Sequence, residues 1–174
     1  AIDSSVDRDN IIVDVGTYYE NIDFGGKNIT LTSTNPEDPN VVEATVIDGG
    51  GNGSVVTFAG SETGDCILKG FTITGGNAGS GGGIYGGLYT KAGISNSTIS
   101  DNSASNGGGM SHCHGIIKNC TITGNAAYGG YGGGLNNCSG KISNCIISNN
   151  SAYVDGGGLY SCRADISNCL ITGN

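Results

Sequence analysis

The sequence repeats itself about every 24 residues, and this repeat limits the architectures open to the chain. Copies of a pattern that reads I-x-N-x-x-I-x-x-N, followed in the first three by three glycines and an apolar residue, begin at Ile94, Ile117, Ile142 and Ile166. A looser copy starts at Leu68. One unit of this length cannot bury a hydrophobic core alone, so successive units must stack on one another. The repeat therefore predicts a solenoid.

The local period within each copy indicates β-strands. Cys120 and Ile122 alternate with Thr121 and Thr123, and the other copies follow the same pattern. Alternation with a period of two is typical of strands, whereas clusters of Gly, Ser and Asn interrupt every segment before a helix could form. We expect an all-β fold, a right-handed single-stranded parallel β-helix of about 24 residues per turn, with about three strands per turn at roughly 4.8 Å between turns.

The chain is expected to form one continuous domain with two parts. Residues 66–174 carry the regular repeats, and residues 1–65 form two or so irregular turns. The strands predicted in the first part cover residues 10–15, 27–33, 43–49 and 54–60. The segments between them, 16–26 and 34–40, are predicted to be loops, and the second of these holds both prolines, Pro36 and Pro39.

Stacking turns each repeat position into a column of side chains that runs along the solenoid. The apolar columns predicted to face inward are Phe71/Ser97/Cys120/Cys145/Cys169, Ile73/Ile99/Ile122/Ile147/Ile171 and Ile84/Met110/Leu135/Leu159. Two asparagine ladders are predicted at corners: Asn96, Asn119, Asn144 and Asn168, and Asn102, Asn125, Asn150 and Asn174. Amides at a corner can satisfy backbone groups that the bend removes from the sheet. We expect both ladders to be structural, and Asn96 and Asn119 to be inaccessible.

Six of the seven cysteines also fall into columns, Cys113/Cys138/Cys162 and Cys120/Cys145/Cys169. A disulfide needs Cβ atoms about 3.5–4.5 Å apart, which is less than the spacing between turns. Buried free thiols acting as small apolar residues are therefore the favoured interpretation, and vertical disulfides are the alternative.

Charge is distributed unevenly along the chain. The net charge is −8, and residues 1–65 hold 12 of the 15 acidic residues. An acidic chain lacks the basic surface that nucleic acids and anionic membranes require, and no apolar run reaches the roughly 20 residues of a membrane span. The polar opening segment, residues 1–10, is typical of a mature secreted protein. We therefore expect an extracellular or cell-surface location, with no nucleic-acid partner and no membrane insertion.

Several segments together resemble a known superfamily. The stretches "VGTYYENIDFGGKNITLTS", "TVIDGGGNGSVVTFAG" and "LKGFTITGG", followed by the GGG-apolar and I-x-x-N elements, are similar to right-handed β-helix repeat proteins of the pectin-lyase-like superfamily. The paired elements also resemble the repeats of polymorphic outer-membrane, autotransporter-like surface proteins. This resemblance covers nearly the whole chain. It implies the fold, while the superfamily includes pectate lyases, polygalacturonases, phage tailspikes and adhesin passengers, so the resemblance does not decide the function.

The repeats hold little that predicts catalysis or metal binding. Asp101, Asp155 and Asp165 occupy three different repeat positions, so no two carboxylates pair on one face for acid–base chemistry. We expect no enzyme activity and no catalytic residues. In "SHCHG" the cysteine belongs to a ladder and the histidines to variable positions, so no metal site is predicted there.

No cofactor is expected, although the acidic N-terminal third leaves a calcium site open as an alternative. The residues that could contribute are Asp3, Asp7, Asp9 and Asp48.

Five tyrosines flank the triple glycines and form a candidate ligand or partner surface: Tyr85, Tyr128, Tyr131, Tyr153 and Tyr160. Aromatic rings there can stack on sugars or on a partner, and the alternative is that they cover loops.

The final residues, "CLITGN", continue the repeat register, with Cys169 and Ile171 predicted to face inward and Leu170 outward. An open turn exposes unpaired backbone and core, and the N-terminal turn of an identical subunit, through Ile11 and Ile12, could cover it. The leading hypothesis is thus a non-catalytic extracellular structural protein that stacks head to tail into a filament. The alternatives are an adhesin or carbohydrate-binding surface passenger with extracellular glycans as partners, and a polysaccharide lyase or glycoside hydrolase.

Overall fold

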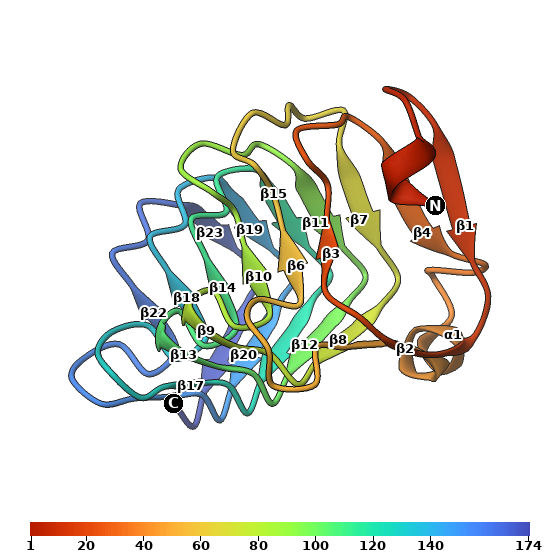
Figure 1. Cartoon of the computed structure of the whole chain (residues 1–174). Helices are drawn as coiled ribbons and strands as arrows, with labels where there is room; N and C mark the ends of the chain where they lie inside the picture. Colours follow the sequence, from red (N-terminus) through yellow and green to blue (C-terminus); the bar gives the residue numbers. More distant parts are fainter.

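A computed structural model describes all residues, 1–174, as a coil of short β-strands (Figure 1). The strands form four parallel sheets, named A to D, that run along the axis of the coil. Two short helices, η1 (Ile2–Ser4) and α1 (Pro39–Ala44), lie at the N-terminal end.

Sheets A and B are the longest and extend through every turn. Sheet A consists of β1 (Asn10–Val13), β4 (Thr30–Ser33), β7 (Ile67–Lys69), β11 (Gly93–Ser95), β15 (Ile116–Lys118), β19 (Lys141–Ser143) and β23 (Asp165–Ser167). Sheet B consists of β2 (Gly16–Tyr19), β5 (Thr45–Asp48), β8 (Thr72–Thr74), β12 (Thr98–Ser100), β16 (Thr121–Thr123), β20 (Ile146–Ser148) and β24 (Leu170–Thr172). Because both sheets run without interruption from the irregular turns into the repeats, the chain is one continuous solenoid.

Sheets C and D complete each turn. Sheet C consists of β3 (Ile22–Asp23), β6 (Val56–Thr57), β10 (Ile84–Tyr85), β14 (Met110–Ser111), β18 (Leu135–Asn136) and β22 (Leu159–Tyr160). Sheet D consists of β9 (Asn77–Ser80), β13 (Ser103–Asn106), β17 (Ala126–Ala127) and β21 (Ser151–Ala152). A regular turn therefore has four strands, in the order A, B, D, C, and not about three. The strands of sheet D are too short and too rich in Ser and Ala to show an alternating pattern.

The first two turns are irregular and join the repeats through β4 with β7, β5 with β8 and β6 with β10. The prediction of loops at 16–26 and 34–40 was wrong in part. The first segment contains β2 and β3, and the second leads into α1. The Asp38 side chain accepts a hydrogen bond from the Asn40 amide, and Pro39 begins the helix, a combination that favours a helix start.

The core is built from columns of identical positions. The register confirms the Ile73 and Ile84 columns. It adds a further column that the sequence analysis did not assign: Leu68, Ile94, Ile117, Ile142 and Ile166. These side chains are fully buried through Ile147 and become exposed in the final turn, where Ile171 is 47% exposed.

The asparagine ladder at the corner between sheets B and D is internal. Asn102, Asn125 and Asn150 are almost fully buried. The Asn125 Oδ1 accepts from both the backbone N–H and the side-chain Nδ2 of Asn102, each at 3.1 Å, and the Asn125 Nδ2 donates onward to the Asn150 Oδ1 at 3.0 Å. The same Nδ2 donates to the Ile99 carbonyl. Each amide therefore satisfies backbone groups of neighbouring turns.

The second ladder, at the corner between sheets A and B, faces outward. Asn96, Asn119, Asn144 and Asn168 have φ between 51° and 54°, the left-handed region that Asn tolerates. Asn119 donates to Asn96 at 3.0 Å, and Asn96 donates to the Glu37 carboxylate at 2.7 Å. The expectation that these residues are inaccessible was wrong, because Asn119 is exposed and Asn96 is half-buried. A single left-handed residue forms this corner and turns its side chain outward.

The triple glycines lie between sheets D and C and are required by close packing. Gly132 has φ +69°, and a Cβ on Gly133 would overlap the carbonyl oxygen of Ser151 in the next turn. Gly133 and Gly134 donate to the carbonyls of Gly156 and Gly157. The glycines thus continue the hydrogen-bonded stack around a corner where no side chain fits.

All seven cysteines are free thiols, five of them buried. The Cys120 and Cys145 thiols donate to the carbonyls of Lys118 and Ser143 within their own turns. Burial, together with the nearby Glu62 carboxylate, raises the pKa of the Cys66 thiol to about 12.

Candidate ligand-binding surfaces

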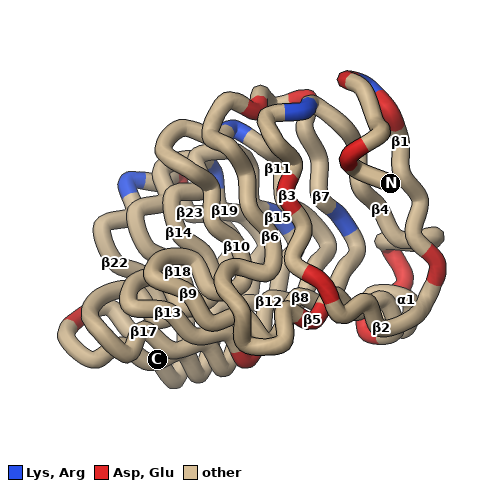
Figure 2. The backbone as a smooth tube through the Cα atoms, in the orientation of Figure 1, with Lys and Arg blue, Asp and Glu red and all other residues tan.

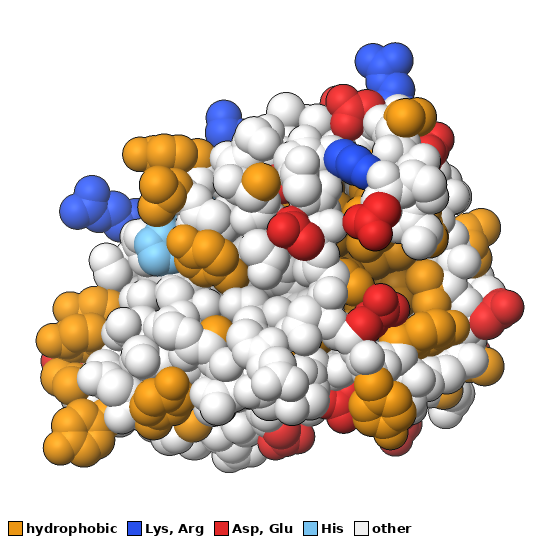
Figure 3. Space-filling view, in the orientation of Figure 1, with side chains coloured by type: hydrophobic (Ala, Val, Ile, Leu, Met, Phe, Trp, Pro, Cys, Tyr) orange, Lys and Arg blue, Asp and Glu red, His pale blue; other side chains and the backbone are white.

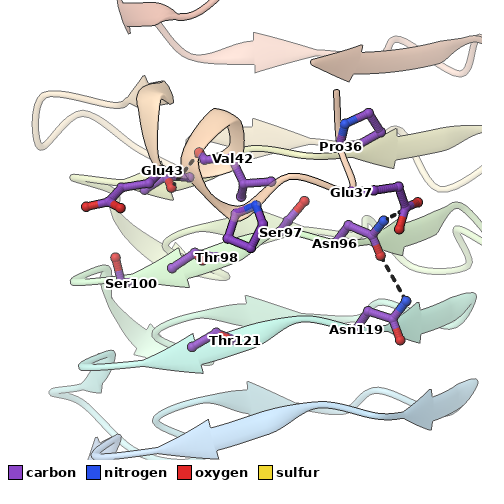
Figure 4. Close-up of a pocket in the computed structure, with 12 residues that line it drawn as sticks. Pro36, Glu37, Val42, Glu43, Asn96, Ser97, Thr98, Ser100, Asn119 and Thr121 are labelled. Atoms are coloured by element: carbon purple, nitrogen blue, oxygen red, sulfur yellow. Dashed lines mark hydrogen bonds between the residues drawn. The ribbon is translucent and has the colours of Figure 1, made fainter. Parts of the chain in front are cut away.

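A polar groove lies between the segment that contains α1 and the outer face of sheet B (Figure 4). Its volume is about 650 Å³. The lining residues come from the 34–44 segment and from strands and corners of three turns: Pro36, Glu37, Pro39, Val42, Glu43, Thr72, Asn96, Ser97, Thr98, Ser100, Asn119 and Thr121. The Thr72 hydroxyl donates to the Val42 carbonyl at 3.0 Å and ties α1 to the sheet.

The chemistry of this groove is that of hydroxyls, amides and two carboxylates. Figure 4 shows Glu37 and Glu43 at opposite ends, with Thr98 and Thr121 on the strands between them. No lysine or arginine lines it. Such a lining suits a hydroxyl-rich neutral ligand better than an anion.

Sequence reasoning missed both glutamates, because they lie in an insert outside the repeats. The signal that could have indicated them is the acidic, proline-containing segment "PEDPNVVEA" between two strands. Asp101, Asp155 and Asp165, which the sequence placed at separate repeat positions, remain apart at a corner after β12, in a loop before β22 and at the start of β23.

Four exposed tyrosines lie in the C-terminal turns, three of them on the loops that connect sheets D and C and Tyr160 at the end of β22. Tyr131 and Tyr160 stack, with ring centroids 4.3 Å apart and an interplanar angle of 22°. Tyr128 and Tyr153 follow β17 and β21 at equivalent positions of successive turns. All four are exposed, Tyr153 by 81%. We call these residues the tyrosine surface; hydrophobic side chains gather at this C-terminal edge in Figure 3.

The fifth tyrosine of the predicted surface lies elsewhere. Tyr85 shares a column with Tyr160 but is three turns away, and its ring meets the edge of His112 with centroids 5.8 Å apart. The structure thus stacks Tyr131 on Tyr160 and places Tyr128 and Tyr153 at equivalent positions of successive turns, and it separates Tyr85 from them. The Tyr128 hydroxyl donates to the Ala78 carbonyl at 3.3 Å.

The "SHCHG" segment divides between core and surface. Cys113 is buried in its column, while the Nδ1 atoms of His112 and His114 lie 2.8 and 2.7 Å from the hydroxyls of Ser111 and Ser139. Burial, and then the charge of His114, lower the pKa of His112. No group of three or more His, Cys, Asp or Glu side chains lies close enough to hold a metal ion.

The N-terminal acidic residues considered for calcium bond backbone amides. Asp7 accepts from the Asn28 N–H, Asp9 from the Val6 N–H and Asp48 from the Gly50 N–H. Asp3 lies in η1. Asp9 and Asp48 thus cap local turns and Asp7 bonds an amide of the next turn, and calcium binding there stays the untested alternative.

The two ends present the residues predicted for self-association. Leu170 and Ile171 are exposed, and Cys169 is half-buried. At the other end Ile11 lines an apolar hollow of about 340 Å³. Ile12 points to the outer face of sheet A and is 62% exposed, so its side chain does not face the end.

Comparison with known proteins agrees with this architecture. The family model for the right-handed β-helix region matches residues 28–174, which include the second irregular turn and all the repeats. No curated protein and no solved structure matches the chain. No helix here has the length and apolar character needed to cross a membrane. The chain belongs to the right-handed β-helix family.

Proposed function

We propose that the chain is a non-catalytic, extracellular β-helix module that binds glycans through the tyrosine surface. The observation that carries this proposal is the gathering of four exposed tyrosines, two of them stacked, on successive turns of a rigid solenoid. Contiguous exposed aromatic groups mark interaction sites more often than chance.

The chemistry of tyrosine fits a sugar ligand. An aromatic face packs on the C–H face of a sugar ring. The Tyr128 hydroxyl donates to the Ala78 carbonyl, which fixes the ring, and the Tyr153 hydroxyl can bond sugar hydroxyls at the rim. Because Tyr128 and Tyr153 repeat at about the 4.8 Å spacing between strands, a linear glycan can contact both along the solenoid axis.

A glycan array tests this proposal. Tyr128→Ala combined with Tyr153→Ala is expected to lower binding by about tenfold or more, because both stacking faces are removed. Tyr19→Ala, an exposed tyrosine on β2 at the other end, is the matched control and should bind as the parent chain does. Equal binding by the double variant and the parent chain would overturn the proposal.

The hydrolase alternative depends on Glu37 and Glu43. Both are exposed, and Glu37 already accepts a hydrogen bond from Asn96, so neither has the apolar surroundings of a typical general acid. This supports a binding role. Release of reducing ends from a polysaccharide panel, abolished by Glu37→Gln and Glu43→Gln, would establish the hydrolase instead.

Head-to-tail stacking of copies is the second proposed function. Exposed Ile166, Leu170 and Ile171 at one end and the apolar hollow beside Ile11 at the other favour it, as does the contrast between an acidic N-terminal part and a mildly basic remainder. Further turns of a longer chain would meet the same faces. Sedimentation velocity of the 174-residue chain should show concentration-dependent rods, shortened by Ile171→Asp; a monomer at all concentrations contradicts the proposal.

An extracellular location is part of the proposal and has its own test. Antibody labelling of intact cells should detect the chain at the surface or in the medium. Detection after permeabilisation alone would contradict it.

A further inference from the structure

A second groove lies on the outer face of sheet A, and it is cationic. Lys69, Ser95 and Lys118 are in register on β7, β11 and β15, so both lysines project from the same column two turns apart. Lys91, from the loop before β11, lines the same groove, whose volume is about 410 Å³. Figure 2 shows blue segments on β7 and near β15, whereas red segments crowd the N-terminal turns.

This concentration of positive charge is unusual in a chain of net charge −8. One acidic residue, Glu37, lines the groove, and its carboxylate is engaged by the Asn96 amide. Among the lysines, Lys27 alone donates from its ammonium group to the chain, through the carbonyls of Ile2 and Asp3. The ammonium groups of Lys69, Lys91 and Lys118 are therefore free to bind an external anion.

The floor of the groove is hollowed by a glycine. Gly93 lies in register between Ile67 and Ile116 on the outer face, and a Cβ there would come within 2.9 Å of the Ile67 Cδ1 atom. Ile116 is exposed. The groove thus offers an apolar wall beside a row of ammonium groups, with the amides of Asn96 and Asn119 at its end.

We propose that this groove binds a sulfated polysaccharide. Lys69 and Lys118 project from strands two turns apart, roughly 9.6 Å along the solenoid, a spacing suited to sulfate groups on separate sugar units. A lysine ammonium group can approach a tetrahedral sulfate from any side. The planar guanidinium group of arginine is the better match for a planar carboxylate, and no arginine lines this groove. The isoleucines would contact the C–H face of the sugar ring.

This site is separate from the tyrosine surface, so the two proposals can fail independently. Heparin is the probe, with binding measured by isothermal titration calorimetry at low and at physiological salt. The parent chain should bind, and binding should weaken as salt rises. Lys69→Gln with Lys118→Gln is expected to lose at least about tenfold in affinity. Tyr128→Ala with Tyr153→Ala should leave heparin binding unchanged.

Two further variants distinguish a built groove from general charge attraction. Arg163→Gln, outside the groove, changes net charge in the same sense and should keep affinity within about twofold. Gly93→Val fills the hollow without changing charge and should weaken binding, with folding checked by circular dichroism. Absence of binding by the parent chain, or equal losses with Arg163→Gln and with Lys69→Gln, would overturn the proposal. Equally tight binding of hyaluronan or polygalacturonate, which carry carboxylates alone, would overturn the assignment to sulfate.

Discussion

The irregular first two turns and the regular turns after them share sheets A and B but satisfy their corners differently. In the repeats, asparagines bond to asparagines of the neighbouring turns. In the first part, carboxylates accept from backbone amides, as Asp23 does from Gly25 and Asp48 from Gly50. An amide both donates and accepts and can therefore extend a chain of hydrogen bonds, whereas a carboxylate accepts and ends it. Carboxylates therefore suit the corners of the first part, where no ladder has to continue.

The largest expected effect tests how tightly the repeats pack. Gly133→Ala should destabilise the chain by about 4 kcal/mol or more, because the new methyl group overlaps the Ser151 carbonyl of the next turn. Gly50→Ala, in the first part, has no neighbour within 4 Å and should cost about 1–2 kcal/mol for its positive φ. Urea unfolding of both variants measures the difference, and similar losses would mean that the close packing is not decisive.

The two asparagine ladders should respond unequally. Asn125→Ala leaves the Asn102 N–H buried without a partner and removes the bonds to the Asn102 side chain and the Ile99 carbonyl, so it should cost about 3 kcal/mol. Asn119→Ala removes a more exposed bond and should cost about 1 kcal/mol. Thermal unfolding monitored by circular dichroism compares them. Equal losses would show that burial of the inner ladder has no special weight.

Within the first part, Glu62 is expected to be the most important carboxylate. It is buried and accepts from the backbone amides of Gly26, Ala59 and Gly60, so Glu62→Gln should cost about 2 kcal/mol. Hydrogen exchange should accelerate at these three amides before it does in the repeats. Glu43→Gln, an exposed control, should stay within about 0.5 kcal/mol.

The last expected effect appears only at alkaline pH and concerns the boundary between the two parts, at Cys66. Its pKa in the folded chain is about 12, above the ordinary value of 9.0. Above pH 9 the unfolded chain loses this proton first, so stability should fall by up to about 1.4 kcal/mol per pH unit until pH 12. Cys66→Ala should reduce the dependence of unfolding free energy on pH by up to about 1.4 kcal/mol per pH unit, which is the contribution of one proton. An unchanged slope in denaturant titrations would contradict the assignment to Cys66.

The fold of the repeats could be predicted from the sequence because each column recurs with the same residue type. Ile99 and Ile122 pair in the register that the spacing implied. The two ladders look alike in sequence, but their burial differs. At the outer corner the ladder asparagine is itself the left-handed residue, whereas at the inner corner the residue before it, such as Asp101 or Gly124, takes that conformation and the asparagine turns inward. The helix α1 was missed since six residues are too few for a helical period to show.

The candidate sites were harder to predict, because they depend on contacts between turns or with the insert. The stacking of Tyr131 on Tyr160 joins residues from two turns. Glu37 and Glu43 reach sheet B through an insert whose course no repeat defines. The lysine column could have been found from the repeat, since Lys69 and Lys118 occupy equivalent positions. Serines fill the same position in the other turns, at Ser95 and Ser143, and this alternation obscured the column.

The two asparagine ladders donate in opposite directions, and this matters for how such a chain can grow by internal duplication. In the inner ladder each side chain donates to the following turn, and in the outer ladder to the preceding one. A duplicated turn that lacks the inner asparagine would orphan a donor on its N-terminal neighbour. One that lacks the outer asparagine would orphan a donor on its C-terminal neighbour. A new turn that carries both asparagines supplies an acceptor for the side-chain amide of each neighbouring turn. This favours duplication of whole repeats over assembly from unrelated segments.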